Sequence, residues 1–202
     1  VITGYLHNLL DFGFGEDARL GKPLAQMQQQ SHRMESLLKD LLWLSRLESP
    51  DGTEEHSEID MGALISEVRD EAMLAEPTRS IDVHLDTDVR IVGDYKQLYS
   101  AVSNIVFNAL KYSEDDVVIR WSVDRQEARL SVVDFGPGID AEHIPRLTER
   151  FYRVDKSRAQ GTGGTGLGLA IVKHVLISHG ARLDIESVPG EGSTFTCVFP
   201  LQ

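Results

Sequence analysis

Apolar side chains recur every three or four positions between residues 24 and 47, which is the spacing of one face of an α-helix. Residues 2–12 also have a helical pattern, and Gly13 and Gly15 end that segment. A long helix with a wide apolar stripe needs a partner, so the pattern predicts a helical hairpin that pairs with a second hairpin in a four-helix bundle. The stripe consists of Met27, Met34, Leu37, Leu38, Leu41, Leu42, Leu44 and Leu47.

Helices and strands are mixed in the rest of the chain, beyond a polar segment at residues 49–57. Asp60 and Asp94 each stand where the N-cap of a helix is expected. The predicted elements are helices at 61–75, after Asp94 and at 167–178, and strands at 81–85, 90–93, 117–123, 128–135, 182–187 and 193–200. This order predicts an α+β fold in which a helical hairpin precedes a two-layer α/β sandwich.

Composition narrows the classes of function. The chain has 202 residues, of which 41% are hydrophobic and 26% charged, enough for one substantial core and a small second unit. Its net charge of −12 repels nucleic-acid backbones, so no nucleic-acid partner is expected. No apolar stretch approaches the roughly 20 residues that span a bilayer, and no signal peptide is evident. The single Cys197 excludes an internal disulfide, fits a reducing compartment and is expected to be a small buried hydrophobe.

Three segments carry the chemistry of an ATP pocket. Asn104 and Asn108 are four positions apart and share one helical face. Asp134 ends an apolar strand, where its carboxylate can accept a hydrogen bond from a purine amino group. Residues 161–168 are rich in glycine, which lets backbone N–H groups approach phosphates at the start of a helix. No one segment is decisive, but their order and spacing predict a nucleotide site.

These segments resemble the N, G1, F and G2 boxes of bacterial sensor histidine kinases, the two-component signal-transduction transferases with a Bergerat (GHKL) ATP-binding domain. The matching blocks are residues 104–112, 134–138, 151–153 and 163–168, with a further glycine-threonine element at 190–195. Residues 143–158 resemble the phosphate-regulon sensor kinases of the PhoR type. The resemblance implies a truncated dimerisation and histidine-phosphotransfer hairpin at 1–48, a linker at 49–57 and a catalytic ATP-binding domain at 58–202.

Within this resemblance, Asn108 would hold a Mg²⁺ ion that bridges the ATP phosphates, and Asn104 would position the reacting phosphate. Lys111 would contact phosphate, Tyr112 would pack against adenosine, and Asp134 would accept the adenine amino hydrogen. Each has a plainer alternative. Asn104 could be a polar residue bridging within the core, Lys111 a solvated lysine at a helix end, and Asp134 a structural residue before a turn.

The long polar segment between Gly138 and Gly163 corresponds to the ATP lid of the family. Arg153, supported by Lys156, would reach the γ-phosphate, and Phe151 would anchor the lid, although a core phenylalanine explains it almost as well. The remaining implied nucleotide contacts are Gly136, Gly138 and Ile139 against the purine, Gly163, Gly164, Thr165, Gly166, Leu167 and Gly168 at the phosphates, and Thr194 on the adenine side.

Three other interpretations share part of the pattern. Gly161, Gly163 and Gly166 match a dinucleotide fingerprint, but the charged residues before them do not form the buried strand that it requires. Residues 134–136 copy the metal-binding triplet of protein kinases without the catalytic loop or strand lysine that accompany it. An ATP-binding regulatory or pseudokinase module, in which the nucleotide only sets conformation, remains open.

Two departures from the family stand out. None of the seven histidines is followed by an acidic residue, as the phosphoacceptor of the family is, and only His7 and His32 lie in the hairpin. Phe135 replaces the usual Asn beside Asp134. The start of the chain resembles the stretch just after the phosphoacceptor, so we expect Mg-ATP binding without autophosphorylation and weak self-association through the hairpin. The resemblance also implies a cytoplasmic location, a response regulator as partner, and a parent protein anchored in the bacterial inner membrane by segments outside this chain.

Overall fold

The computed structural model of the chain describes residues 21–48, 56–154 and 164–201. The predicted helix at 2–12, most of the linker and the site positions Lys156 and Gly163 lie outside the described residues. The helices are α2 (Gly21–Leu47), α3 (Met61–Ala75), α4 (Tyr95–Tyr112), the short 3₁₀ helix η2 (Ile144–Arg146) and α5 (Gly168–Ser178). None of these helices has the length and apolar character that a membrane span requires in the described ranges.

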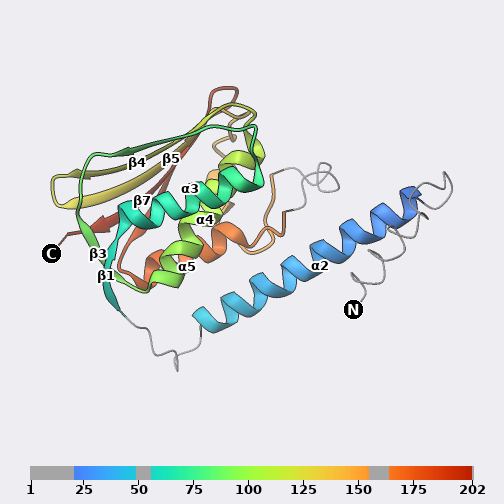
Figure 1. The fold of residues 1–202 in the computed structure, drawn as a ribbon, viewed down its shortest axis with the longest axis horizontal. Helices are drawn as coiled ribbons and strands as arrows, with labels where there is room; N and C mark the ends of the chain where they lie inside the picture. The colour runs from blue at the N-terminus through green and yellow to red at the C-terminus, as the bar shows by residue number, and fades with distance from the viewer. Residues whose placement is uncertain (1–20, 49–55, 155–163, 202) are drawn as a thin grey trace.

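Five strands form one mixed sheet, and α3, α4 and α5 lie against one of its faces as a second layer (Figure 1). The strands are β2 (Ile81–Leu85), β4 (Val117–Asp124), β5 (Glu127–Asp134), β6 (Arg182–Val188) and β7 (Gly192–Pro200). They lie in the order β2-β4-β5-β7-β6, with β2 and β4 parallel and the other neighbours antiparallel. The predicted two-layer α/β sandwich is confirmed.

Alternating side chains divide the sheet into an inner and an outer face. On β5, Ala128, Leu130 and Val132 are fully buried beneath the helices, as the period of two along a strand requires. Trp121 of β4 is also fully buried and meets Phe199 of β7 edge to face, with ring centroids 6.1 Å apart. The core of the molecule therefore lies between the inner face of the sheet and the three helices.

Cys197 belongs to this core. It is buried on β7, and burial raises the pKa of its thiol to about 12, because the thiolate would lose its hydration there. The prediction of a small buried hydrophobe is confirmed.

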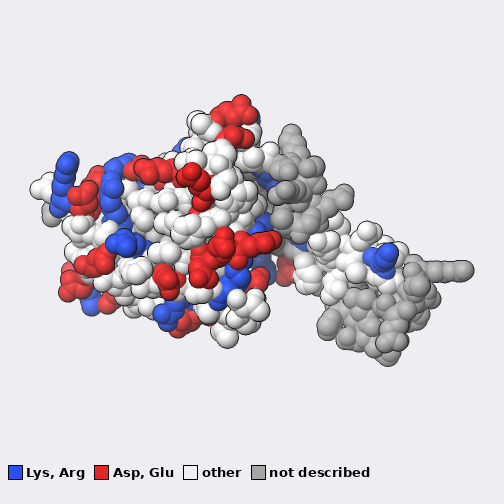
Figure 2. Space-filling model, turned by 90° about the horizontal axis from the view of Figure 1, so that it is seen from above, with Lys and Arg blue, Asp and Glu red and all other residues white. Residues whose placement is uncertain are grey.

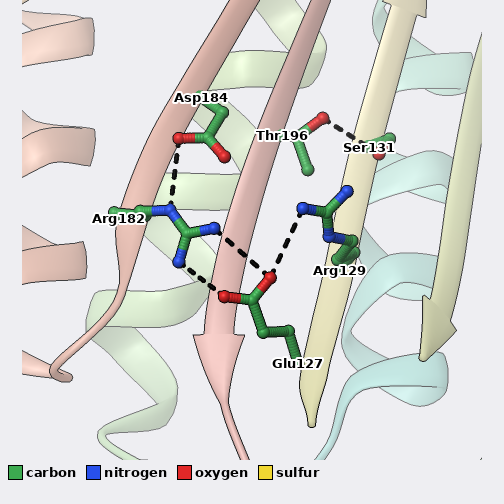
Figure 3. Close-up of polar contacts among 6 residues, drawn as sticks. All are labelled: Glu127, Arg129, Ser131, Arg182, Asp184 and Thr196. Atoms are coloured by element: carbon green, nitrogen blue, oxygen red, sulfur yellow. Dashed lines mark hydrogen bonds and ion pairs between the residues drawn. The ribbon is translucent and has the colours of Figure 1, made fainter. Parts of the chain in front are cut away.

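Polar side chains of β5, β6 and β7 interact on the outer face of the sheet (Figure 3). Glu127 of β5 accepts hydrogen bonds from Arg182 of β6 at 2.7 Å and from Arg129 of its own strand at 3.3 Å. Ser131 and Thr196 share a hydrogen bond of 3.0 Å across β5 and β7. These charges neutralise one another in partly exposed positions, so each pair contributes little to stability. Figure 2 shows acidic and basic side chains interspersed over the visible face of the molecule, without one extended basic patch.

The two predicted helix caps are confirmed. The Asp60 carboxylate accepts from the Ala63 N–H at 3.0 Å, and the Asp94 carboxylate accepts from the Gln97 N–H at 3.0 Å. Each aspartate satisfies one of the backbone donors that the first turn of a helix leaves free. The cap at Asp94 fixes the start of α4, the helix that carries both asparagines of the predicted nucleotide site.

Two short elements were not predicted. Strand β1 (Ser57–Asp60) pairs antiparallel with β3 (Arg90–Gly93), and it begins at the last residue assigned to the linker. Only Ile59 of β1 is buried, so the strand has almost no apolar pattern of its own, and its pairing with β3 defines it. Helix η2 is a single turn with Pro145 near its start, too short for a helical period to appear.

Helix α2 contacts the α/β sandwich along one side, near α5 (Figure 1). Leu44 is 3% exposed in this contact, and the His174 Nε2 of α5 donates to the Leu47 carbonyl at 2.8 Å. Arg150 forms an ion pair with Glu48 just beyond the end of α2. The apolar side chains left exposed on α2 are Met27, Met34, Leu38, Leu41 and Leu42.

Candidate nucleotide-binding site

Helix α4 brings four of the predicted site residues to one end of the sandwich. The Asn104 Nδ2 donates to the Ser100 carbonyl at 2.8 Å, which fixes the orientation of its amide. Gly168 at the start of α5 packs so closely that a Cβ there would lie 2.6 Å from Asn104 Oδ1. The half-buried Asn108 has no side-chain hydrogen bond to any residue that the structure describes, so its amide oxygen is available to a ligand.

Two cations and a glycine meet beside the last turn of α4. The Arg153 Nη1 donates to the Gly164 carbonyl at 2.7 Å, and a Cβ on Gly164 would lie 2.3 Å from Lys111 Nζ. Lys111 Nζ also lies 5.1 Å from the ring centroid of Tyr112. The structure therefore brings together Lys111, Arg153 and the glycine-rich segment, as predicted for the phosphate end of the site.

The environment of Lys111 disfavours its charged form. Burial lowers the pKa of Lys111 to about 8, and the positive charges of Arg153 and of Arg33 on α2 add to this effect. Within the described parts of the chain, no carboxylate forms an ion pair with Lys111. A half-buried ammonium group among other cations is well suited to receive an anion.

Phe151 contacts the glycine-rich segment through its backbone. The Phe151 N–H donates to the Gly166 carbonyl at 2.8 Å, and both residues have positive φ, 63° and 76°. A Cβ on Gly166 would lie 2.9 Å from the backbone of Phe151, so only glycine fits at this approach. Phe151 is 56% exposed, so it is not a core phenylalanine, and its contact with the glycine-rich segment is made by its backbone.

Asp134 lies at the end of β5 and is only 5% exposed. Its Oδ1 accepts from the Gly136 N–H at 2.9 Å. Burial raises the pKa of Asp134, and hydrogen bonds from the backbone of Gly136 and from the backbone and side chain of Ser193 partly oppose that effect. The carboxyl group is thus held in one orientation, with a fixed acceptor geometry, in a nearly dry position.

The loop after Asp134 rests on the turn between β6 and β7. Gly138 has a φ of 67°, and a Cβ there would lie 2.0 Å from the Val188 carbonyl, so this position requires glycine. The Ile139 N–H donates to Ser187 Oγ at 2.8 Å. A Cβ on Gly136 would lie 2.5 Å from the Tyr112 carbonyl. Gly136, Gly138 and Ile139 therefore hold the loop between the end of α4 and the β6–β7 turn.

The β7 residue beside Asp134 differs from the one that the sequence indicated. Ser193 pairs with Asp134 in the sheet and contacts its carboxyl group, whereas the next residue, Thr194, points to the opposite face of the strand. Thr194 is followed on that outer face by Thr196, which bonds to Ser131. Ser193 rather than Thr194 is the β7 residue at Asp134, and strand alternation relative to the buried Phe195 was the signal that would have identified it.

Arg79 is a second residue that no motif indicated. Its Nη1 donates to the Ser113 carbonyl at 2.7 Å and to the Leu110 carbonyl at 3.2 Å, and its Nη2 donates to the Asp115 carbonyl. The guanidinium group thereby satisfies acceptors around the C-terminal end of α4. This contact fixes the helical turn that carries Lys111.

The N-terminus of α5 completes the arrangement. Leu167 is buried, and its N–H donates to Thr165 Oγ1 at 3.2 Å. The Thr165 hydroxyl in turn donates to the Asp40 Oδ2 of α2 at 2.7 Å. The dipole of α5 favours negative charge at this end, which faces Asn104.

The sequence profile of the family described as histidine kinase-, DNA gyrase B- and HSP90-like ATPase matches residues 93–202. The chain belongs to this ATPase family. Its site residues on α4, β5 and α5 all lie within the matched region.

This ATPase chain is 53% identical over 203 residues to the phosphate regulon sensor protein PhoR of Pseudomonas aeruginosa, an alignment that covers 98% of the chain and 46% of that protein. The chain thus spans about half the length of the curated relatives that it matches. The predicted resemblance to sensor histidine kinases, including the PhoR type, is confirmed.

Solved structures agree with this assignment. The mycobacterial sensor histidine kinase MprB has a TM-score of 0.63 and 30% identity, covering 72% of this chain and 97% of that one. Full-length ShkA in complex with AMPPNP has a TM-score of 0.74 and 25% identity, covering 91% of this chain and 39% of that one.

The sheet of the ATPase excludes the dinucleotide alternative. That fingerprint belongs to a doubly wound parallel sheet, whereas only β2 and β4 are parallel neighbours here. The interpretation of the glycine-rich segment as a dinucleotide site is therefore wrong.

Proposed function

We propose that the chain binds Mg-ATP at the end of α4 and serves as the catalytic ATP-binding part of a sensor histidine kinase. The proposal rests on the way α4, the loop after β5 and the N-terminus of α5 meet at one site. The Asp134 carboxyl group lies at one side of this site, and Lys111 and Arg153 lie at the other. The complex of its structural relative ShkA with AMPPNP supports a nucleotide there. We assign residues 58–202 to this part and residues 1–48 to the helical hairpin.

Asn108 is suited to Mg²⁺ because its amide oxygen is a hard, neutral ligand without a partner among the described residues. When bound, Mg²⁺ supplies charge neutralisation across the phosphate oxygens. Asn104, held by the Ser100 carbonyl, orients the phosphate chain from the same helical face. Arg153 and Lys111 stabilise negative charge that develops on the transferred group.

The acceptor of the phosphoryl group would be a histidine outside the residues that form this site, and an aspartate of a response regulator would receive it next. The exposed apolar stripe of α2 supports self-association of the hairpin, because side chains such as Leu38 and Leu42 leave a contiguous apolar surface in water. We propose that the whole kinase works at the cytoplasmic side of the bacterial inner membrane.

Replacing Asn108 with alanine is expected to remove most of the Mg²⁺-dependent gain in ATP affinity. Asn108→Asp is expected to weaken binding as well, because it adds a negative charge beside a polyanion. Isothermal titration calorimetry with ATP, in Mg²⁺ and in EDTA, measures the metal-dependent part directly. Ser103→Ala, five positions earlier and on another face of α4, serves as the control. If ATP affinity depends on Mg²⁺ to the same extent in both Asn108 variants, Asn108 is not a ligand of the metal ion.

The chain alone is expected not to label itself with phosphate from ATP, since none of its seven histidines has an adjacent acidic residue to its C-terminal side. A separate peptide hairpin that bears a histidine followed by an acidic residue is expected to become labelled by the chain in trans. Radiolabelled ATP, followed by acid and alkali treatment, identifies phosphohistidine because it is acid-labile and alkali-stable.

Two outcomes of that labelling experiment would contradict the proposal. Acid-labile label on His7 or His32 would show that the hairpin of this chain already contains an acceptor. ATP binding without transfer to any hairpin would favour the alternative, a regulatory or pseudokinase module.

A further inference from the structure

One face of α2 is turned toward the nucleotide site. Residues 33, 40, 44 and 47 lie within a narrow angular sector of an ideal helix, and none of them is exposed. Their contacts run along the sandwich, from the Thr165 hydroxyl on Asp40 to the buried Leu44 and the Leu47 carbonyl at α5. The face therefore has a fixed orientation, and Arg33 lies about 10 Å beyond Asp40 along it, two helical turns nearer the N-terminus of α2.

Arg33 adds positive charge to the phosphate end of the site. Its charge contributes to the lowered pKa of Lys111, as does that of Arg153, so both arginines lie within electrostatic reach of Lys111. Neither Arg33 nor Lys111 forms an ion pair with a carboxylate in the parts of the chain that the structure describes. The charges of Arg33 and Arg153 both act on Lys111 although the protein has a net charge of −12, and this local excess of positive charge suits an anionic ligand.

We propose that Arg33 is part of the phosphate end of the nucleotide site and that Asp40 holds it there. In this arrangement Asp40 keeps α2 against Thr165, and the Arg33 guanidinium faces the phosphates together with Lys111. The ligand chemistry is that of a nucleoside polyphosphate, and the inference rests on the proposed nucleotide site. It makes α2, a helix of the hairpin, a contributor to nucleotide affinity.

Nucleotide binding and docking of α2 affect each other equally. If docked α2 strengthens binding of the polyphosphate, then the bound polyphosphate strengthens docking of α2 by the same factor. The position of the hairpin relative to the ATP-binding part is then coupled to nucleotide occupancy.

Arg33→Ala is expected to weaken ATP binding about 10- to 150-fold, in line with the loss of one charge-assisted phosphate contact. Binding of adenosine, which has no phosphate, is expected not to change. Arg46→Ala, on the opposite and exposed face of the same helix, is the matched control and is expected to leave both affinities unchanged. Arg33→Lys is expected to retain part of the affinity as a point charge.

A double-mutant cycle tests the role of Asp40. In the Asp40→Ala background, Arg33→Ala is expected to change ATP affinity less than twofold, because α2 no longer holds the guanidinium group in place. Asp40→Ala also removes a negative charge near the phosphates, so the coupling between the two changes is the quantity to measure. Calorimetry on the full 202-residue chain, with circular dichroism as a check on folding, gives all four affinities.

The outcomes separate this inference from the proposed function. Equal ATP affinities for Arg33→Ala and Arg46→Ala, or a loss of adenosine binding as large as that of ATP, would overturn the role of Arg33. An Arg33 effect that persists in full without Asp40 would overturn the role of Asp40. If the unchanged chain bound neither ATP nor adenosine, the proposed nucleotide site itself would be wrong.

Discussion

Asp134→Ala is expected to weaken ATP binding about 5- to 150-fold and to abolish a preference for ATP over GTP. The carboxyl group is nearly dry and held by Gly136 and Ser193, so it can accept the adenine amino hydrogen without prior reorganisation. Guanine presents a carbonyl oxygen at the equivalent place, which sets two acceptors against each other at a free-energy difference of about 1–3 kcal/mol.

Asp134→Asn provides the sharper test. The Gly136 N–H needs an acceptor, so the amide oxygen of the variant is expected to take the place of Oδ1 and its NH₂ group to face the base. That donor opposes the adenine amino group and suits the guanine carbonyl, so the preference should shift toward GTP. Competition binding with both nucleotides measures the shift, and Asp184→Ala on the outer face of the sheet serves as control. A variant that still prefers ATP to the original extent would refute the role of Asp134.

Raising the pH above 8 is expected to reduce ATP affinity by about tenfold per pH unit, until the pKa of Lys111 in the complex is reached. The free protein has a Lys111 pKa of about 8, because burial and the neighbouring cations disfavour the ammonium form. A bound polyphosphate favours that form and raises the pKa. Above pH 8, ATP binding is therefore coupled to protonation of Lys111, and the ATP affinity falls as the pH rises.

The stability of the free chain is expected to change in the opposite direction. The folded-state pKa of Lys111 lies below the ordinary value of 10.5, so between about pH 8 and 10.5 the unfolded chain binds more protons at this site. The contribution of Lys111 to the free energy of unfolding therefore rises with pH in that window. Below about pH 8, Lys111 of the folded chain is charged in an environment that disfavours the charge, and a bound nucleotide reduces this free-energy cost.

Calorimetry in buffers of different ionisation enthalpy measures the proton uptake directly. Lys111→Met is expected to bind ATP weakly and without this pH dependence, whereas Lys173→Met, at an exposed position of α5, should retain it. An unchanged pH profile in Lys111→Met would show that another group takes up the proton.

Local patterns determined much of the fold in advance. The strands Ile81–Leu85 and Arg90–Gly93 have the predicted ends, because turn residues and the Asp94 cap bound them on the chain itself. The shared face of Asn104 and Asn108 follows from the helical period alone. These features depend on neighbours a few residues away, which the sequence displays directly.

Features that depend on distant contacts escaped prediction. Alternation within β7 puts Ser193 on the same face as Phe195, but only the register of β7 with β5 shows that Ser193 lies beside Asp134. Arg79 bonds to carbonyl groups more than 30 residues away, and no local pattern marks such a partner. The hydrogen bond between Asp40 and Thr165 exists only because α2 docks against a segment 125 residues further along the chain.

The pairing of Asp134 with Ser193 also sets when the site comes into existence. The two residues lie on adjacent strands, and β7 follows β5 in the chain only after α5 and β6. During synthesis, α4 and β5 emerge from the ribosome well before β7, so the carboxyl group of Asp134 has no Ser193 beside it and the loop that carries Gly138 has no turn to rest on. A growing chain cannot hold ATP in this geometry until β7 has entered the sheet, so nucleotide binding at this site marks the completion of the five-stranded sheet.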